Sequence, residues 1–587
     1  MMNGQVKKLA LAVGVALGGM GMVPSAQAVN IANNNQGQVL IFPYYTVNGG
    51  WSTLFGITNT SASVVVAKVR FREAYNSRDV FDFNIILSPR DVWTGWVAQN
   101  ASGGASIFTE DTTCTVGTIS SSGQPFPGAV SYSGPYADGG PTTTARANEG
   151  YVEVIMMGAV ALPPVATPDP YALARGAVHA ANGTPPGCAA LVSAFQTTTG
   201  LATLRAQFGY DTAAGTGSAP GAAPVPGVNP AALNPLTGSF SLVNGITGLS
   251  TSGKPVTLAN FWVPPVPGAI GSNTAVLAPG ALNVALNNII TAQLPPASLA
   301  ALGAAPLPFL GSWHEPSLNT ANTNGFAIAP AAGPVAPASG ALISSAGGAN
   351  QNQTALLVPA TGANAVSFVL NATSVINEWT RRTNPTAGWT TETDWVVAFP
   401  TKNFYVDMDF NNEFAGRNVG RSGTGAVGTF TLPTLTSNTV PSPFAQYFVN
   451  RDVTTATVPN NFLSPTPAVL RGSSCVVTTN TLYNREEASV VGQGFSPGGS
   501  NSLCYEANVL TFAGSNVLET APPISQSLDT LPGTFGWMNL GLAATASTAP
   551  STTGLPAVGF QLTVRTNSIL GNTSLNSAAV VNHSYLP

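Results

Sequence analysis

Between residues 38 and 98, apolar and polar side chains alternate along several short runs, the pattern of β-strands that bury one face. In the run 64–73 the apolar positions include Val65, Ala67, Val69 and Phe71. The run 81–87 repeats this alternation. Together the two runs predict an antiparallel hairpin that is stabilised by burial of its aromatic and aliphatic faces.

The opposite faces of the same two runs carry charges. Arg70 or Arg72 lies across from Asp82, and we expect an exposed cross-strand pair worth about 0.2 to 1 kcal/mol. Upstream, Asn48-Gly49 separates the apolar runs 38–47 and 51–57. Asn-Gly between two apolar runs predicts a further hairpin.

Strand-like runs recur along the rest of the chain, separated by segments rich in Gly, Pro, Ala, Ser and Thr. The clearest runs are 151–156, 355–358, 365–370, 394–400, 403–407, 535–538 and 558–564. Many short strands between Gly and Pro turns are typical of all-β folds. The prediction is therefore a mainly β protein, an antiparallel β-sandwich or jelly-roll-like fold with long Gly/Pro/Ala-rich loop insertions.

The organisation along the chain follows from the same changes in composition. Residues 1–28 have the form of a signal peptide: Lys7 and Lys8 precede an apolar stretch that ends in small residues. Next come an N-terminal β region over 29–160 with an excursion at 101–145, an Ala/Pro/Gly-rich segment with short strands over 161–350, and a C-terminal β region over 351–587.

Charged residues are scarce, at 7% of the chain against roughly 25% in an ordinary soluble protein. Without the two leader lysines, 18 basic residues face 24 acidic ones. This balance argues against nucleic acid as a partner, because phosphate binding needs clustered Lys and Arg. No further apolar stretch reaches the roughly 20 residues of a membrane-spanning helix.

The four cysteines are Cys114, Cys188, Cys475 and Cys504, and their number fits an oxidising compartment. Three pairings are open. We favour Cys114 with Cys188 and Cys475 with Cys504, because each pair would close a Gly/Ser/Thr-rich excursion that has little core of its own.

Two segments carry a resemblance to a known group. The run 42–47 with 68–73 and 76–80, and the run 393–402, resemble a group of uncharacterised exported bacterial proteins, some of them labelled surface-layer-like. The resemblance covers about a quarter of the chain. It implies a bacterial cell-surface location and brings no catalytic residues with it.

The best candidate for a metal site is a set of alternating oxygen ligands, Asp407, Asp409 and Asn411. Calcium is the one cofactor that they suggest, although an EF-hand would need glycine at Asn412 and glutamate at Asn418. The alternative is a polar strand end that faces water.

A sugar site is the other candidate. Trp379, Trp389 and Trp395 lie near Glu378, Glu392 and Asp394, which would supply stacking surfaces and an acid–base pair for glycoside hydrolysis. We prefer the alternative that these tryptophans fill a core or a subunit interface. The three histidines are far apart in sequence and no G-x-S-x-G elbow is present, so no catalytic triad is assigned.

These patterns predict a non-catalytic structural protein of the bacterial cell surface, a self-assembling surface-layer or matrix subunit. It would be exported, at the cell surface or outside the cell or associated with the outer membrane, with copies of itself and envelope polysaccharide or lipid as partners. The alternatives are a carbohydrate-binding adhesin or secreted glycoside-active enzyme, and an outer-membrane β-barrel.

Overall fold

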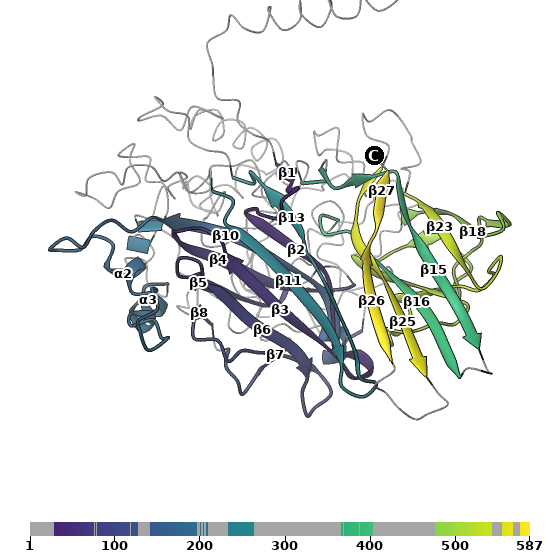
Figure 1. The fold of residues 1–587 in the computed structure, drawn as a ribbon, viewed down its shortest axis with the longest axis horizontal. Coiled ribbons are helices and arrows are strands. Elements are labelled where there is room, and N and C mark those ends of the chain that lie inside the picture. Colours follow the sequence, from purple (N-terminus) through teal and green to yellow (C-terminus); the bar gives the residue numbers. More distant parts are fainter. Residues whose placement is uncertain are drawn as a thin grey trace, which may run out of the picture.

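The computed structural model is mostly β, and all its strand pairs except one are antiparallel among the described residues (Figure 1), which confirms the predicted fold class. The structure describes residues 29–126 without 76, 78 and 118; 141–208 without 196–199, 201, 202, 205 and 206; 233–262; 318; 366–402 without 368, 385 and 387; 476–542; 554–567; and 576–586. The predicted signal peptide, 1–28, lies outside these residues.

A seven-stranded sheet forms the centre of the N-terminal half. Its order is β1 (Asn30–Ile31), β13 (Val256–Ala259), β2 (Val39–Thr46), β10 (Glu149–Val160), β4 (Val64–Glu73), β5 (Asp79–Leu87) and β8 (Cys114–Val116). The predicted hairpin of β4 and β5 is present, with Phe71 opposite Phe81 and Val69 opposite Phe83. Arg70 lies opposite Asp82 as predicted, but both side chains are fully buried, so the expectation of an exposed pair is wrong.

A six-stranded sheet covers the apolar face of the first sheet. Its order is β12 (Leu249–Gly253), β11 (Leu236–Asn244), β3 (Trp51–Asn59), β6 (Val92–Gln99), β7 (Ala105–Phe108) and β9 (Gln124–Pro125). The rings of Phe42 and Phe55 meet edge to face between the two sheets at 5.3 Å, and those of Phe55 and Phe71 at 5.6 Å. Edge-to-face contacts of this kind add to the area that the aromatic side chains bury.

The turn at Asn48-Gly49 does not close a hairpin. The short 3₁₀ turn η1 (Asn48–Gly50) carries the chain from β2 in one sheet to β3 in the other. Gly49 and Gly50 have φ angles of 56° and 80°, which only glycine adopts easily. The Asn-Gly signal therefore identified a tight turn correctly, but its two strands pair with strands far away in sequence.

The C-terminal half contains a ten-stranded sheet. Its strands are β15 (Ser374–Asn384), β16 (Trp389–Ala398), β18 (Thr479–Asn484), β19 (Ser489–Val491), β21 (Ala507–Phe512), β22 (Ser525–Leu528), β23 (Phe535–Gly541), β25 (Val558–Asn567), β26 (Ser577–Asn582) and β27 (Ser584–Leu586). The sheet folds over at β15, whose first part pairs with β23 and whose last part pairs with β16. Two short pairs lie beside it, β14 (Asn371–Ala372) with β24 (Leu555–Pro556) and β17 (Val476–Val477) with β20 (Ser502–Leu503).

Strand β16 separates two hydrophobic cores. Trp395 and Val397 face the core of the folded ten-stranded sheet, whereas Val396 and Ala398 belong to the core of the N-terminal half. This is the alternation of a strand that is buried on both faces. The two halves therefore pack directly on each other, as Figure 1 shows side by side.

Besides η1, the helices assigned among the described residues are η3 (Thr144–Asn148), α2 (Ala172–Arg175) and α3 (Cys188–Phe195). A disulfide joins Cys114 of β8 to Cys188 of α3, with the Cα atoms 5.3 Å apart, as the first of the two favoured pairs predicts. Cys504 is disulfide-bonded as well, and its predicted partner Cys475 lies outside the described residues. Within the described part of the chain, no helix combines the length and apolar character needed to cross a membrane.

Candidate functional site

The most unusual feature of the interior is a network of charges on the seven-stranded sheet. Lys68 and Arg70 of β4 approach Asp82 of β5, with nitrogen-to-Oδ2 distances of 3.0 and 3.6 Å. Arg72 Nε lies 3.0 Å from Glu153 Oε1 of β10, and all five side chains are fully buried. The same alternation that turns Val69 and Phe71 toward the apolar core places these charges on the other face. A buried ion pair costs desolvation energy, so removing one partner alone would be strongly destabilising.

This network reaches the C-terminal half through Tyr151 of β10. The Tyr151 hydroxyl lies 2.7 Å from Ser77 Oγ and donates a hydrogen bond to the Pro400 carbonyl at 3.3 Å. Burial raises the pKa of the Tyr151 phenol, with the charge of Glu153 adding to the effect. The phenol therefore stays protonated and acts as a hydrogen-bonding link between the halves.

A second polar group at the same junction is Glu149. Its Oε2 accepts hydrogen bonds from the Tyr44 hydroxyl at 2.5 Å and the Thr520 hydroxyl at 3.1 Å. Burial raises the pKa of Glu149 to about 7, against the smaller opposing effect of these donors. A carboxyl group that titrates near neutrality suits proton transfer. Here, however, both hydrogen-bond donors are buried, and they belong to different halves of the protein, Tyr44 to β2 and Thr520 to the C-terminal half. Glu149 therefore links the two halves.

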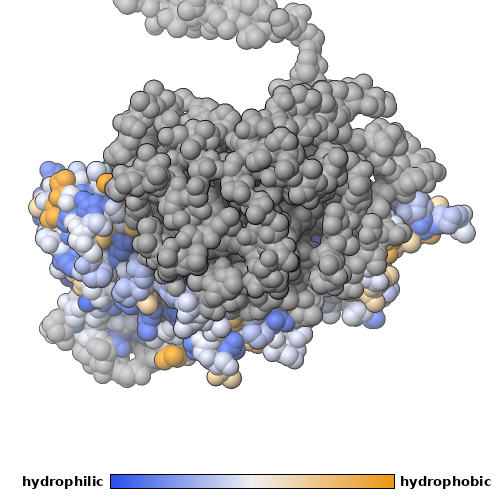
Figure 2. Space-filling model, turned by 180° about the vertical axis from the view of Figure 1, so that it is seen from behind, coloured by the Kyte–Doolittle hydropathy of each residue, from blue (hydrophilic) through white to orange (hydrophobic). Residues whose placement is uncertain are grey.

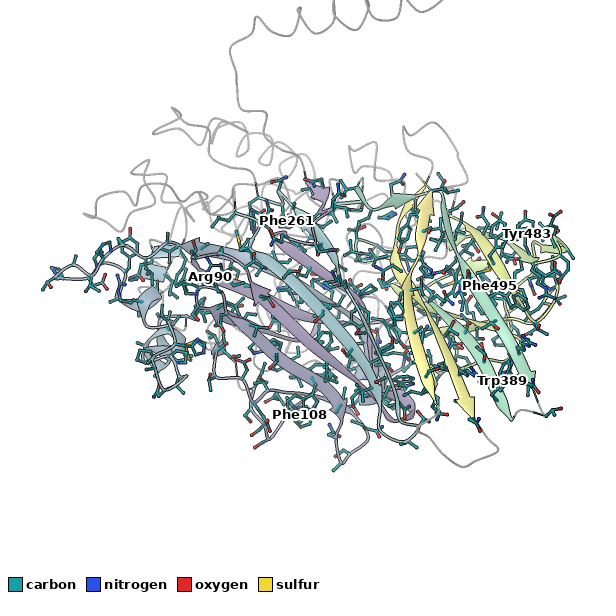
Figure 3. All side chains as sticks on the ribbon, viewed as in Figure 1. Arg90, Phe108, Phe261, Trp389, Tyr483 and Phe495 are labelled. Carbon is teal, nitrogen blue, oxygen red and sulfur yellow. A yellow bond between two sulfur atoms is a disulfide. The ribbon has the colours of Figure 1, made fainter. Side chains whose placement is uncertain are left out.

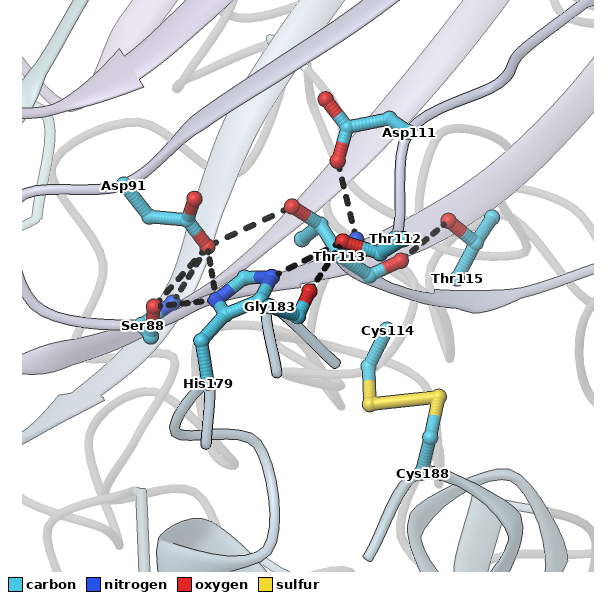
Figure 4. Close-up of a disulfide and its surroundings, with 10 residues drawn as sticks. All are labelled: Ser88, Asp91, Asp111, Thr112, Thr113, Cys114, Thr115, His179, Gly183 and Cys188. Carbon is cyan, nitrogen blue, oxygen red and sulfur yellow. Dashed lines mark hydrogen bonds and ion pairs between the residues drawn. A yellow bond between two sulfur atoms is a disulfide. The ribbon is translucent and has the colours of Figure 1, made fainter. Parts of the chain in front are cut away.

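The structure brings one histidine close to a serine and an aspartate, beside the disulfide (Figure 4). Ser88 Oγ lies 2.9 Å and Asp91 Oδ2 3.5 Å from His179, but both contact the same ring nitrogen, Nδ1. A catalytic triad needs the nucleophile at one ring nitrogen and the carboxylate at the other. The Thr112 hydroxyl lies 3.3 Å from His179 Nε2 and donates a hydrogen bond to the Gly183 carbonyl at 2.7 Å. These contacts fix the loops around the disulfide and do not form the geometry of a nucleophile with its base.

The predicted sugar site is not assembled at the surface. Trp379 and Trp395 are 1% and 0% exposed, and their rings pack on Phe512 at 6.0 and 5.8 Å. They fill the core of the ten-stranded sheet, the alternative that the sequence favoured. Trp389 is half-buried at the start of β16.

The carboxylates of that candidate site are also occupied or separated. Glu392 pairs with Arg381. Asp394 is buried and accepts hydrogen bonds from Ser515 Oγ at 3.0 Å and Leu518 N at 2.9 Å. Burial raises the pKa of Asp394 to about 6. Glu378 is exposed on β15 whereas Asp394 is fully buried, so the three carboxylates do not form one exposed site.

The calcium candidates Asp407, Asp409 and Asn411 lie outside the described residues. Within the described part of the chain, no group of three or more His, Cys, Asp or Glu side chains could hold a metal ion.

The outer face of the six-stranded sheet is the most extensive candidate surface, and we call it the neutral face. Its members are Ser52, Leu54, Gly56 and Thr58 of β3; Val92, Thr94, Trp96 and Ala98 of β6; Thr237, Ser239, Ser241 and Val243 of β11; and Ser250 and Ser252 of β12. None of these residues is charged. Leu54 and Val92 are 40% and 46% exposed, and Trp96 stacks on Phe108 of β7 at 5.5 Å.

Sequence reasoning missed this surface, although the signal was present. Serine, threonine and glycine alternate with core residues along β3 and β11, and the two strands pair in a register that places Ser241 beside Leu54. A charge reaches the neutral face at its edge, where Asp111 accepts a hydrogen bond from the Thr94 amide at 2.9 Å. From behind, the described surface mixes hydrophilic residues with isolated hydrophobic ones (Figure 2).

No family model, curated protein or solved structure matches this chain. The meaning of the neutral face and the buried charges therefore follows from their chemistry alone.

Proposed function

We propose that this protein is a non-catalytic structural component of the bacterial cell surface, and that its copies associate through the neutral face. The observation that carries the proposal is the absence of charge across four adjacent strands of this face, β12, β11, β3 and β6. Charged side chains are the usual means by which a soluble protein prevents contact between its copies. A sheet face without them favours contact.

The size of the neutral face approaches that of a stable interface. With strands about 4.8 Å apart and residues about 3.3 Å apart, its four strands span roughly 500 Å². Stable interfaces bury about 800 Å² on each partner. The edge strand β26 adjoins β12, where the Val580 amide donates to Thr251 Oγ1 at 3.0 Å. Its outward residues Ala579 and Val581 extend the uncharged surface beyond β12.

Export to the cell surface is supported by two features. Residues 1–28 have the form of a signal peptide. The disulfide between Cys114 and Cys188 is compatible with an oxidising compartment. The segments that resemble exported bacterial surface proteins lie in β2, β4, β5 and β16, which are core strands and carry no site chemistry.

The test is the concentration dependence of assembly. We expect residues 29–587 to form oligomers or sheets as concentration rises, measured by sedimentation velocity and electron microscopy. Replacing Leu54 and Val92 by glutamate would place two charges in the interface and prevent assembly. The matched control is Val491→Glu on β19, which is 69% exposed and lies off the neutral face.

The control variant should assemble as the unmodified protein does. A dispersed monomer at roughly 100 µM, well above the Kd of a stable interface, would refute the proposal. Equal assembly of the Leu54/Val92 variant would refute the role of this face.

A further inference from the structure

Exposed cations are rare in the described part of the chain, and two of them lie together. The Lys and Arg side chains that are exposed or half-exposed there are Arg90, Arg175, Lys254, Arg381, Arg382, Arg485 and Arg565. Arg382 lies near the end of β15 and Arg565 near the end of β25, and Arg381 precedes Arg382. We call Arg382, Arg565 and Trp389 the arginine patch. Figure 3 shows Trp389 at the lower end of these strands.

The indole of Trp389 organises the patch. The guanidinium carbon of Arg382 lies 5.4 Å from the ring centroid, and that of Arg565 lies 4.8 Å from it. The strand register explains this convergence, because Thr391 of β16 pairs with Arg382 on one side and Arg565 on the other. Contact with one aromatic ring restricts both long side chains, so less freedom is lost when they bind an anion.

Both arginines of the patch are available to bind an anion. The neighbouring Arg381, on the opposite face of β15, pairs with Glu392 and donates a hydrogen bond to the Ala513 carbonyl at 3.3 Å. No carboxylate of the described residues pairs with Arg382 or Arg565, and both are exposed. Two guanidinium groups held beside one ring present a fixed set of N–H donors. Guanidinium groups bind carboxylates through two parallel hydrogen bonds.

We propose that the arginine patch binds an acidic polysaccharide through the carboxylate groups of its sugars. Hydroxyl and amide groups lie on the same face as the two cations: Asn384 of β15, Thr391 of β16 and Asn567 of β25. These groups match the hydroxyls of a sugar, whereas a lipid surface would need apolar side chains to insert. Trp389 is half-buried under two guanidinium groups and does not offer such an insertion. The inference rests on the proposed function, because a protein of the bacterial cell surface would be surrounded by such polymers.

The test measures binding of residues 29–587 to polygalacturonate, with neutral dextran as the uncharged polymer. We expect binding to polygalacturonate alone, with loss as salt rises from about 0.05 to 0.5 M because the contacts are ionic and exposed. Replacing Arg382 and Arg565 by glutamine should weaken binding roughly tenfold or more. The matched control is Arg485→Gln, because Arg485 lies 5.1 Å over the Phe535 ring and is also exposed. It should bind as the unmodified protein does.

A variant with lysine at both positions separates charge from folding, since it keeps the cations and should bind better than the glutamine variant. Equal binding by the unmodified protein and the glutamine variant would overturn the proposal. So would binding to phosphatidylglycerol vesicles without binding to polygalacturonate. The glutamine variant should still assemble, and the Leu54/Val92 variant should still bind polygalacturonate, so failure of one proposal is distinguishable from failure of the other.

Discussion

Replacing His583 by glutamine should remove a pH dependence of stability that this side chain imposes. His583 is buried beside Trp395, with the ring centroids 4.9 Å apart. Its Nε2 donates to the Val396 carbonyl at 2.9 Å, and its Nδ1 accepts from the Asn377 amide at 3.0 Å. Only the neutral imidazole with its proton on Nε2 makes both contacts.

Burial lowers the pKa of His583 from 6.5 to about 4, against the smaller opposing effect of its bond to Val396. In the unfolded chain the histidine takes up a proton as pH falls through 6.5, while the folded protein does not. Its contribution to stability is therefore complete above pH 6.5, declines as pH falls, and is lost by pH 4. A pKa shift of this size corresponds to about 3 kcal/mol in the free energy of unfolding.

The assay is urea unfolding of the unmodified protein and of His583→Gln at intervals from pH 4 to pH 7.5. Glutamine can donate to Val396 and accept from Asn377 without titrating, and the shifts of other groups cancel in the difference. The free energy of unfolding of the unmodified protein, minus that of the variant, should rise by about 3 kcal/mol between pH 4 and pH 6.5. A flat difference, or one that falls with rising pH, would refute the reasoning. With three histidines in the chain, an NMR titration can also follow each imidazole, and one should titrate near pH 4.

Three further predictions concern stability. Glu149→Gln should give the opposite pH dependence to that of His583→Gln. Because the pKa of Glu149 is raised to about 7, the free energy of unfolding of the unmodified protein should fall by about 3 kcal/mol relative to that of the variant as pH rises from 4.5 to 7, measured by the same unfolding series. Replacing Cys114 and Cys188 by serine should lower the free energy of unfolding by about 4 kcal/mol, because the disulfide closes a loop of 74 residues, and equal thermal midpoints would contradict this. Trp395→Ala should lower it by about 3 to 5 kcal/mol through an unfilled core, whereas a loss under 1 kcal/mol would show that the site is not packed as described.

Local alternation was enough to predict the hairpin of β4 and β5, because the side-chain period of two fixes both the face and the register. It also predicted the antiparallel β class. The same pattern could not show that Arg70 and Asp82 are buried, since that depends on what covers the sheet. Likewise, β11 and β13 join the N-terminal sheets from a segment whose composition suggested loops with short strands.

The candidate sites show the same division between local and long-range information. The spacing of Trp379 and Trp395 along the chain could not distinguish a stacking surface from a core, and only the packing on Phe512 decides it. The arginine patch was hidden for the same reason. Arg565 and Arg382 are far apart in sequence, and only the pairing of β16 with both β15 and β25 brings them to one ring.

The buried charges and the neutral face both follow from how the few charged residues of this chain are divided between the interior and the surface. The charged residues that the described part buries are Lys68, Arg70, Arg72, Glu73, Asp82, Arg146, Glu149, Glu153, Asp394, Lys402 and Glu506. In a chain with 7% charged residues, placing this many inside leaves few for the surface. Buried ion pairs are weak sources of stability and retain a role mainly where they fix one arrangement over others. The ion pairs of Lys68, Arg72, Arg146 and Lys402 each lie within one half of the protein, and hydrogen bonds of Tyr151 and Glu149 link the halves. The surface that remains carries little of the charge that would oppose the proposed contact between copies.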